Sequence, residues 1–395
     1  MKTKEVIDLY GKYVMPTYKQ TPVVLVKGKG IKVWDIEGRE YLDFFPGWAV
    51  SGLGHCHPRV VNAIKAQCKK MIHIPNNYYN NLQARLAGVI SESSFGGKVF
   101  FCNSGAEANE AAIKFARIYG QGKRFEIITM EKSFHGRTLA TVAATGQDKI
   151  KKGFSPLPPG FRHVRFNDFQ AVKDAIGPQT VAIMLEPIQG EGGINIASAD
   201  YLSKVRKLCD QKDILLIFDE IQTGMGRTGA MFGYQHYGII PDLMTLAKTL
   251  GGGVPIGAMV AARKIADTLK PGSHASTFGG SPLVCSASLA AFKAIEKEGL
   301  LDNARNMGKY MFDQLGELKK RHSMIKEVRG IGLMVGVELN QEGATVVEKC
   351  LKRKLLINCA QGNVLRLMPP ITVTKKNIDK AIRILNKVLT IETGG

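Results

Sequence analysis

The sequence predicts an α/β protein in which a large domain with a mostly parallel sheet is joined to a smaller α+β domain. Between about Asn62 and Leu300, short apolar runs alternate with helical patterns, which is typical of strand and helix units around a parallel sheet. After Leu300 the pattern changes to one helix, strand-like segments and further helix and strand units. The expected strands are Lys98–Phe101, Phe125–Thr129, Val181–Glu186, Leu215–Asp219, Leu243–Leu246 and Ala258–Ala261, and the expected helices are Ala106–Tyr119, Ala199–Gln211 and Pro282–Lys297.

The first fifty residues are expected to complete the small domain. They begin with an amphipathic helix, and Val23–Lys27 and Ile31–Gly38 alternate in polarity as the two strands of a hairpin do. We therefore divide the chain into an N-terminal segment of the small domain (1–55), a large domain (56–285) and a C-terminal small domain (286–395).

Composition favours an ordinary soluble protein of the cytoplasm. Hydrophobic residues make up 45% of the chain and charged residues 22%. No apolar run is long enough to span a membrane, and the charged N-terminus has no apolar core of a signal peptide. The seven cysteines include no Cys-x-x-Cys pair, which indicates reduced thiols.

No metal site is predicted. His55-Cys56-His57 has the right side chains, but three adjacent residues do not converge on one ion from a regular strand. The following Pro58 favours a turn that enters a helix.

The net charge of +20 raises the alternative of nucleic-acid binding. However, the basic residues are dispersed in short pairs, and no nucleic-acid-binding motif accompanies them. We interpret the charge as a basic surface that attracts anionic substrates, and we expect no nucleic-acid partner.

An aspartate and a lysine are the strongest functional signals. Asp219 ends an apolar run that is expected to be a buried strand, and Lys248 precedes three consecutive glycines. An acidic residue after an apolar run also resembles a Walker B element, but the chain has no P-loop to accompany it. A lone lysine is usually exposed, yet the residues around Lys248 are apolar or small. The pair fits a pyridoxal phosphate site, in which Lys248 would form a Schiff base and Asp219 would keep the pyridine nitrogen protonated.

A helix N-terminus is the expected phosphate site. The segment Asn103-Ser-Gly-Ala-Glu-Ala-Asn-Glu110 follows a strand and opens a helix, whose free N–H groups and dipole attract anions. The same residues also fit a plain capped helix, with Asn103 or Ser104 as the cap and Glu107 completing a capping box. With Asp219 and Lys248 in the same chain, we rank the phosphate site first.

Further candidate residues follow other strands. Phe134 can stack on a flat cofactor and Arg137 can bind a carboxylate. Glu191 lies in a glycine-rich loop that is expected at the same crevice, and Thr277 offers a hydroxyl for a phosphate. Arg366 lies inside an apolar strand, where an unpaired charge would be costly, so a buried partner or an anionic ligand is expected.

These segments resemble the class III pyridoxal-phosphate aminotransferases over nearly the whole chain, from about residue 20 to the end. They are most similar to the branch that comprises the acetylornithine and ornithine aminotransferases. The motifs that carry the resemblance are Asn103-Ser-Gly-Ala-Glu-Ala-Asn-Glu, Ser133-Phe-His-Gly-Arg-Thr, Glu186-Pro-Ile-Gln-Gly-Glu-Gly-Gly, Phe218-Asp-Glu-Ile-Gln-Thr-Gly-Met-Gly-Arg-Thr-Gly and Leu246-Ala-Lys-Thr-Leu-Gly-Gly-Gly-Val-Pro-Ile-Gly.

The resemblance implies the fold type I architecture of aspartate aminotransferase, with a seven-stranded, mainly parallel sheet, and a homodimer with shared active sites. It implies that Lys248 is the Schiff-base lysine and proton shuttle, and that Asp219 pairs with the pyridine nitrogen. The other implied cofactor contacts are Gln222 on the phenolic oxygen, Phe134 and Ile221 on the two ring faces, and Ser104, Gly105 and Ala106 on the phosphate, with Thr277 from the other subunit.

For the substrates, the resemblance implies that Arg137 binds the α-carboxylate of acetylornithine and Arg366 that of glutamate or 2-oxoglutarate. Glu191 resembles the residue that pairs with Arg366 while the ω-amino substrate is bound and releases it for the dicarboxylate. Trp48 and Ser276 are further substrate-site candidates.

The expected reaction transfers the δ-amino group of N2-acetylornithine to 2-oxoglutarate and gives N-acetylglutamate 5-semialdehyde and glutamate, as in arginine biosynthesis. Ornithine, succinylornithine, succinyldiaminopimelate and 4-aminobutyrate are the alternative donors. Trp48, Pro75 and Asn77 depart from the family pattern and leave the donor open. Glu191 and Arg366 count against an aminomutase, and the retention of Lys248 and Asp219 counts against a scaffold without activity.

Overall fold

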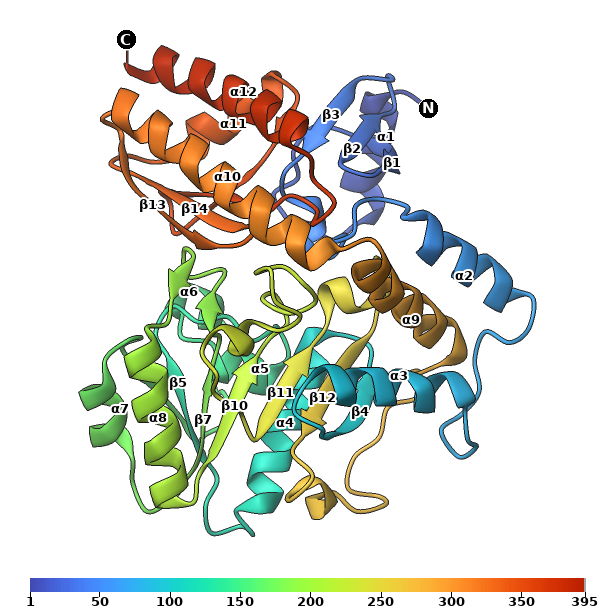
Figure 1. Ribbon diagram of the computed structural model, residues 1–395, viewed down its shortest axis with the longest axis vertical. Helices are drawn as coiled ribbons and strands as arrows, with labels where there is room; N and C mark the ends of the chain where they lie inside the picture. The colour runs from blue at the N-terminus through green and yellow to red at the C-terminus, as the bar shows by residue number, and fades with distance from the viewer. Residues whose placement is uncertain (394–395) are drawn as a thin grey trace.

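A seven-stranded sheet forms the centre of the computed structural model, which describes residues 1–393 (Figure 1). The strand order is β4-β12-β11-β10-β7-β5-β6, and β12 runs in the direction opposite to the other six strands. The strands are β4 (Lys98–Cys102), β5 (Glu126–Met130), β6 (Phe161–Val164), β7 (Thr180–Leu185), β10 (Leu215–Asp219), β11 (Leu243–Leu246) and β12 (Gly257–Ala261).

The six strands expected from the sequence are all present, two of them with identical bounds and the others within one residue at each end. The strand β6 was not predicted. It is a short edge strand, and Arg162 and His163 in its centre interrupt the apolar run that marks the buried strands. The antiparallel direction of β12 was not predicted either, because an apolar run does not encode the direction of its pairing.

Both faces of the large sheet are covered by helices, as a parallel sheet requires. Successive residues of one strand point to opposite faces, so Ile127 packs with the side chains of α4 and Ile128 packs with the cluster that includes α8. The α4 residues in this contact are mostly alanines, which bring the helix close to the sheet. The helices of this part are α2 (Pro58–Cys68), α3 (Asn81–Ser93), α4 (Gly105–Tyr119), α5 (Leu139–Ala144), α6 (Asp148–Lys151), α7 (Phe169–Ala175), α8 (Ala199–Lys212) and α9 (Pro282–Lys297).

Short elements connect the larger ones. Pro58 is the first residue of α2, as the sequence predicted for the segment after His57. The remaining short elements are η1 (Pro46–Ala49), η2 (Gly233–His236), η3 (Lys248–Gly251), η4 (Ala266–Thr268) and the two-stranded sheet of β8 (Ile188–Gln189) and β9 (Asn195–Ile196).

The end of the chain folds into an antiparallel four-stranded sheet covered by long helices, which lies above the large sheet in Figure 1. Its strand order is β13-β14-β17-β16. The elements are α10 (Leu300–Arg321), β13 (Ile325–Ile331), β14 (Met334–Leu339), α11 (Ala344–Lys352), β16 (Asn358–Ala360), β17 (Val364–Leu367) and α12 (Lys375–Thr393).

The beginning and the end of the chain share a third sheet. The hairpin predicted from the first fifty residues is present as β1 (Leu25–Lys29) and β2 (Lys32–Asp35), and β3 (Glu40–Asp43) follows it. The short strand β15 (Leu355–Leu356) then adds to β3 in parallel. The limits of the three chain segments stay a prediction.

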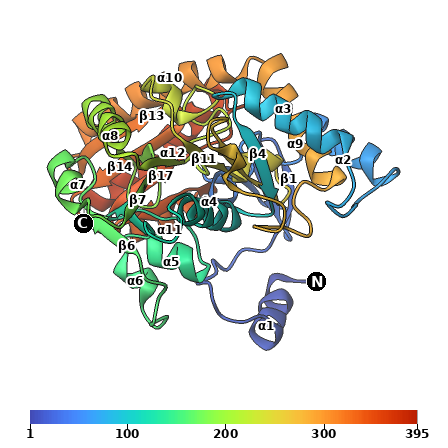
Figure 2. The same ribbon diagram turned by 90° about the horizontal axis from the view of Figure 1, so that it is seen from below.

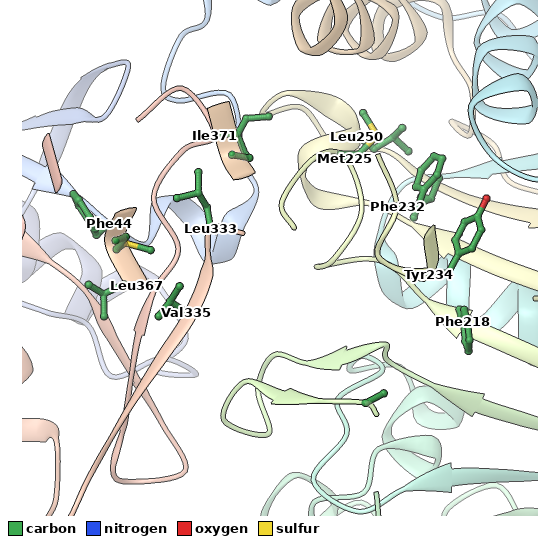
Figure 3. Close-up of a cluster of buried hydrophobic side chains, with 14 of the residues drawn as sticks. Phe44, Phe218, Met225, Phe232, Tyr234, Leu250, Leu333, Val335, Leu367 and Ile371 are labelled. Carbon is green, nitrogen blue, oxygen red and sulfur yellow. The ribbon is translucent and has the colours of Figure 1, made fainter. Parts of the chain in front are cut away.

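One buried cluster continues from the large sheet into the C-terminal part (Figure 3). Phe218 and Phe232 lie on the side of the large sheet, and Leu333 and Leu367 lie on the C-terminal sheet. Arg227 is buried between them, and its Nη1 donates to the carbonyl oxygens of Leu333 and Pro369. A shared core of this kind holds the two parts in one arrangement.

The N-terminal helix α1 (Thr3–Tyr13) projects from the rest of the molecule (Figure 2). None of its residues is buried, although Ile7, Leu9 and Tyr10 are large and apolar. Among residues 1–393, no helix is long and apolar enough to cross a membrane.

Candidate active site

A cavity of about 480 Å³ lies at the carboxyl edge of the large sheet. This is the place where open α/β sheets bind their ligands. Its walls come from the segments that follow β4, β5, β7, β10 and β11. Among the predicted site residues, those that line the cavity are Ser104, Gly105, Ala106, Phe134, Arg137, Glu191, Asp219, Ile221, Gln222 and Lys248.

The carboxylate of Asp219 is held by donors on three sides. Its Oδ2 accepts from Nδ2 of Asn109 at 2.8 Å and lies 2.8 Å from Nδ1 of His135. Its Oδ1 accepts from the backbone N–H of Ile221 at 3.1 Å. The side chain is 4% exposed. These three contacts fix the orientation of the carboxylate, which lines the cavity.

The partners of Asp219 are themselves fixed. Thr245 on β11 donates its hydroxyl to Oδ1 of Asn109 at 2.7 Å, which turns the Asn109 amide nitrogen toward Asp219. His135 is buried, and its Nε2 has no partner among the described residues. With Asp219 ionised, Nδ1 of His135 is the donor in the contact between them.

Lys248 lies in the turn after β11 with a backbone φ of 50°. Residues other than glycine rarely adopt this left-handed backbone conformation. It costs about 1–3 kcal/mol, and strain of this kind is typical of functional sites. Burial lowers the pKa of Lys248, whereas the carboxylates of Glu191 and Asp219 act in the opposite direction. A larger share of the amine is therefore neutral and nucleophilic near neutral pH than for an exposed lysine.

The start of α4 combines both interpretations of its sequence. Ser104 is the N-cap and accepts from the backbone N–H of Glu107 at 3.2 Å, and the Glu107 carboxylate accepts from the N–H of Asn103 at 2.6 Å. Glu107 accepts from Asn103 and not from the cap residue Ser104, so the predicted capping box is not formed. The first turn of the helix, at Gly105 and Ala106, lies on the wall of the cavity. The free N–H groups of this turn form an anion site.

Gly105 packs closely on Ile221. A Cβ atom at Gly105 would lie 2.8 Å from Cδ1 of Ile221, so that a larger residue would displace the Ile221 side chain, which lines the cavity. Phe134 lines the cavity as well, and its ring lies 5.7 Å from the guanidinium carbon of Arg137. Arg137 is exposed at the mouth of the cavity, where an incoming anion can reach it.

Gln222 lines the cavity, and one of its polar atoms has no hydrogen-bond partner among the described residues. Its Nε2 donates to the carbonyl oxygen of Trp48 at 3.3 Å, while its buried Oε1 has no partner within residues 1–393. A buried oxygen in this position indicates a ligand with a matching donor.

The buried Arg366 has a charged partner, as the cost of an unpaired charge predicted. The Arg366 side chain is 1% exposed, and its Nη1 lies 2.6 Å from Oε1 of Glu191, whose side chain is 23% exposed. The rings of Phe45 and Trp48 lie 4.7 Å and 5.4 Å from its guanidinium carbon. Trp48 thus lies against the arginine and is 50% exposed, and it is not one of the residues that line the cavity.

Ser276 and Thr277 lie outside the cavity of this chain. The hydroxyl oxygen of Ser276 accepts from Nδ2 of Asn103 at 3.2 Å, so that Ser276 contacts the residue before the N-cap of α4. Thr277 is exposed.

Sequence reasoning assigned no role to several side chains that hold this site together. Asn109 and His135 fix Asp219, and both lie within motifs that were singled out. Glu186 accepts from the backbone N–H groups of Phe134 and Gly190 and so joins two loops of the cavity wall. Burial raises the pKa of Glu186 to about 7, although His135 and these N–H groups favour its ionised form. Asn358, which contacts Arg366, was also missed.

Comparison with known proteins identifies the class. The family model of class III aminotransferases matches residues 13–389. The chain is 55% identical to the acetylornithine aminotransferase of Caldanaerobacter subterraneus subsp. tengcongensis, over 96% of this chain and 98% of the relative. It is 53% identical to the acetylornithine aminotransferase of Methanocaldococcus jannaschii, over 99% of both chains.

Solved structures agree. An ornithine aminotransferase from Toxoplasma gondii, described with partial occupancy of pyridoxal phosphate at its active site, has a TM-score of 0.95 and 34% identity. The match covers 99% of this chain and 94% of that one.

The protein is therefore a transaminase that depends on pyridoxal phosphate, with the fold type I architecture. More specifically, the chain belongs to the class III aminotransferases.

The residues of the cavity fit this cofactor. The first turn of α4 suits a phosphate, and Oε1 of Gln222, which has no hydrogen-bond partner among the described residues, suits a hydroxyl group. The carboxylate of Asp219, which is fixed by hydrogen bonds, suits a protonated ring nitrogen. Among residues 1–393, no group of three or more His, Cys, Asp or Glu side chains could hold a metal ion.

Proposed function

We propose that the protein transfers the δ-amino group of N2-acetylornithine to 2-oxoglutarate and forms N-acetylglutamate 5-semialdehyde and glutamate. The relatives at 53–55% identity carry the name acetylornithine aminotransferase. On this proposal the enzyme serves arginine biosynthesis in the cytoplasm.

The contact between Arg366 and Glu191 is the observation that carries the proposal. A transaminase of this kind must accept an ω-amine with an uncharged chain next to it, and then a dicarboxylate in the same cavity. While Glu191 pairs with Arg366, the charge of Arg366 is neutralised and does not repel the amine. When the Glu191 side chain turns away, Arg366 becomes available for the carboxylate of 2-oxoglutarate.

Arg137 is proposed to bind the α-carboxylate of the amino donor. It lies at the mouth of the cavity, on the far side of Phe134. A donor held there by its carboxylate would extend its δ-amino group inward, to Lys248 and Asp219.

The bound cofactor supplies a conjugated ring that accepts electrons from the substrate carbon and carries the amino group between the two substrates. We assign Lys248 as its attachment point and as the base that moves a proton at the substrate carbon, since its amine is buried and its pKa is lowered. Asp219, held by Asn109 and His135, keeps a proton on the ring nitrogen. Phe134 and Ile221 hold the ring, Gln222 binds its hydroxyl group, and the first turn of α4 binds the phosphate.

A homodimer is part of this proposal. Thr277 is exposed in the single chain, which suits a residue that reaches the phosphate of the partner subunit. Helix α1 exposes apolar side chains and buries none, which suits a helix that packs on a second copy.

The test is one half-reaction. Purified holoenzyme is mixed with N2-acetylornithine in the absence of any keto acid, and the visible absorption of the cofactor is followed. The proposal requires rapid loss of the absorption of the pyridoxal form, followed by its return when 2-oxoglutarate is added. A spectrum that does not change with this donor would contradict the assignment.

Ornithine is the second candidate donor, because the solved structure with a TM-score of 0.95 is an ornithine aminotransferase. The same experiment with ornithine, succinylornithine, succinyldiaminopimelate and 4-aminobutyrate ranks the alternatives. A faster reaction with one of them identifies that compound as the donor.

A further inference from the structure

One edge of the Arg366 guanidinium is occupied by a side chain other than Glu191. Oδ1 of Asn358 accepts from Nε of Arg366 at 2.9 Å and from Nη2 at 2.5 Å. Hydrogen bonds from a charged donor are among the stronger ones in proteins. Asn358 therefore determines how the plane of the guanidinium is turned.

The two residues are held opposite each other by backbone pairing. Asn358 on β16 and Arg366 on β17 are directly paired in the antiparallel sheet, so that their side chains share one face. Gly336 on β14 is the partner of Arg366 on the other side and has no side chain to compete. The contact with Asn358 is thus part of the rigid sheet.

Glu191, by contrast, lies in the loop between β8 and β9. Its carbonyl oxygen accepts from Nε2 of Gln361 at 2.8 Å, which restrains the backbone of this loop. A movement that releases Arg366 therefore needs the side chain of Glu191 alone. The hydrogen bonds of Asn358 do not depend on it.

The five N–H bonds of the Arg366 guanidinium show which donors become free when the Glu191 side chain moves away. Arg366 has five N–H bonds, of which Nε and one of Nη2 go to Asn358. The two of Nη1 go to the carbonyl oxygen of Gly190, at 3.1 Å, and to Glu191. The second N–H of Nη2 has no acceptor among the described residues. Departure of Glu191 therefore frees one N–H on Nη1 beside the free one on Nη2, and these two suit the two oxygens of a carboxylate.

We propose that Asn358 is a positioning residue for the dicarboxylate half of the reaction: it holds Arg366 so that the end of its guanidinium faces the cavity when Glu191 turns away. This inference rests on the proposed function of Arg366. It assigns selectivity between the two substrates to a side chain that touches neither of them.

The experiment compares two asparagines of the same hairpin. Asn358→Leu removes the acceptor at similar volume, and Asn358→Ala repeats the test without a large side chain. Asn363→Leu is the matched control, because Asn363 is similarly half-buried and donates to the carbonyl oxygen of Leu339 instead. The affinity of each holoenzyme for glutarate, a dicarboxylate that cannot be transaminated, is measured by calorimetry, together with KM for 2-oxoglutarate and for the amino donor.

Both Asn358 variants are expected to bind glutarate about 10-fold more weakly and to raise KM for 2-oxoglutarate by a similar factor. KM for the amino donor should change less than about 2-fold, because Arg366 is not used in that half, and Asn363→Leu should match the wild type. Equal losses for both substrates, or none, would overturn the role of Asn358, as would a wild-type enzyme that does not bind glutarate. If acetylornithine is no substrate but glutarate binding weakens in both variants, the donor is wrong and the role of Asn358 stands.

Discussion

Nδ1 of His135 lies 2.8 Å from Oδ2 of Asp219, and both side chains are buried at the base of the cavity. His135 belongs to the same loop as Phe134 and Arg137. The orientation of the carboxylate opposite the cofactor is thereby linked to the wall of the substrate pocket.

Replacement of Asp219 by Ala is expected to leave cofactor attachment possible and to lower kcat by a factor of 100 or more, because the ring nitrogen loses its counter-charge. His135→Leu is expected to lower kcat by about 10- to 100-fold, since leucine has no donor and one hydrogen bond to a charged group is lost. Steady-state kinetics with saturating cofactor measure both effects. Unchanged turnover of Asp219→Ala would remove that residue from the site.

Arg366→Ala should damage the two half-reactions unequally. The half-reaction with 2-oxoglutarate is expected to slow by about 100-fold or more, because a bidentate charged contact is lost. The half-reaction with acetylornithine should slow much less, although Glu191 is then left without its partner. Rapid mixing with each substrate alone separates the two. The control is Arg165→Ala, which changes an exposed arginine outside the cavity. If Arg366→Ala slows both half-reactions equally, the result argues against the proposed switch.

The lowered pKa of Lys248 predicts the pH dependence of cofactor attachment. Burial favours the neutral amine, so the rate at which pyridoxal phosphate attaches to the apoprotein should reach its half-maximum below pH 10.5, the ordinary value for lysine. Glu191 raises the pKa of Lys248 and Arg366 lowers it. Glu191→Gln removes one of the carboxylates that raise the pKa of Lys248, while Asp219 and Glu186 remain, so that its profile should shift to lower pH. Lys248→Ala provides the baseline without attachment, and a shift to higher pH in Glu191→Gln would contradict this electrostatic account.

Asp242 is expected to stabilise the base of the large sheet. Burial raises the pKa of Asp242, but the backbone N–H of Leu216 and the guanidinium of Arg206 outweigh it, and the pKa lies below 3.8. Its stabilising effect is therefore present at pH values above about 4 and is lost as the pH falls through the lowered value. Asp242→Asn should reduce the free energy of unfolding by about 2–3 kcal/mol at pH 7, and the difference from wild type should shrink below pH 4.

Urea unfolding at pH 7 and at pH 3 measures this prediction. Asp210→Asn is the matched control, because Asp210 also contacts Arg206 but is 59% exposed. Asp210→Asn is expected to reduce the free energy of unfolding by less than about 1 kcal/mol. A loss in Asp242→Asn that stays constant down to pH 3 would exclude the ion pair as its cause.

Local sequence signals predicted the parts of the fold that local forces determine. The apolar run Leu215–Asp219 forms β10 with the predicted bounds, and the cap residues at Ser104 start α4 one residue from the predicted position. The expectation that the buried Arg366 has a partner followed from the cost of an unpaired charge, and the contact with the half-buried Glu191 confirmed it.

The sequence by itself thus determined the strands and helices that carry the chemistry and the residue types at their ends, because apolar periodicity and helix capping act between near neighbours. Only the tertiary structure decided which distant side chains hold Asp219: His135, 84 positions away, and Asn109, 110 positions away. It also placed Trp48 against Arg366, from a turn in which Trp48 has a positive φ of 60°. Such contacts depend on the register of strands and the path of loops, which are set by the packing of the whole chain and leave no mark in the residues nearby.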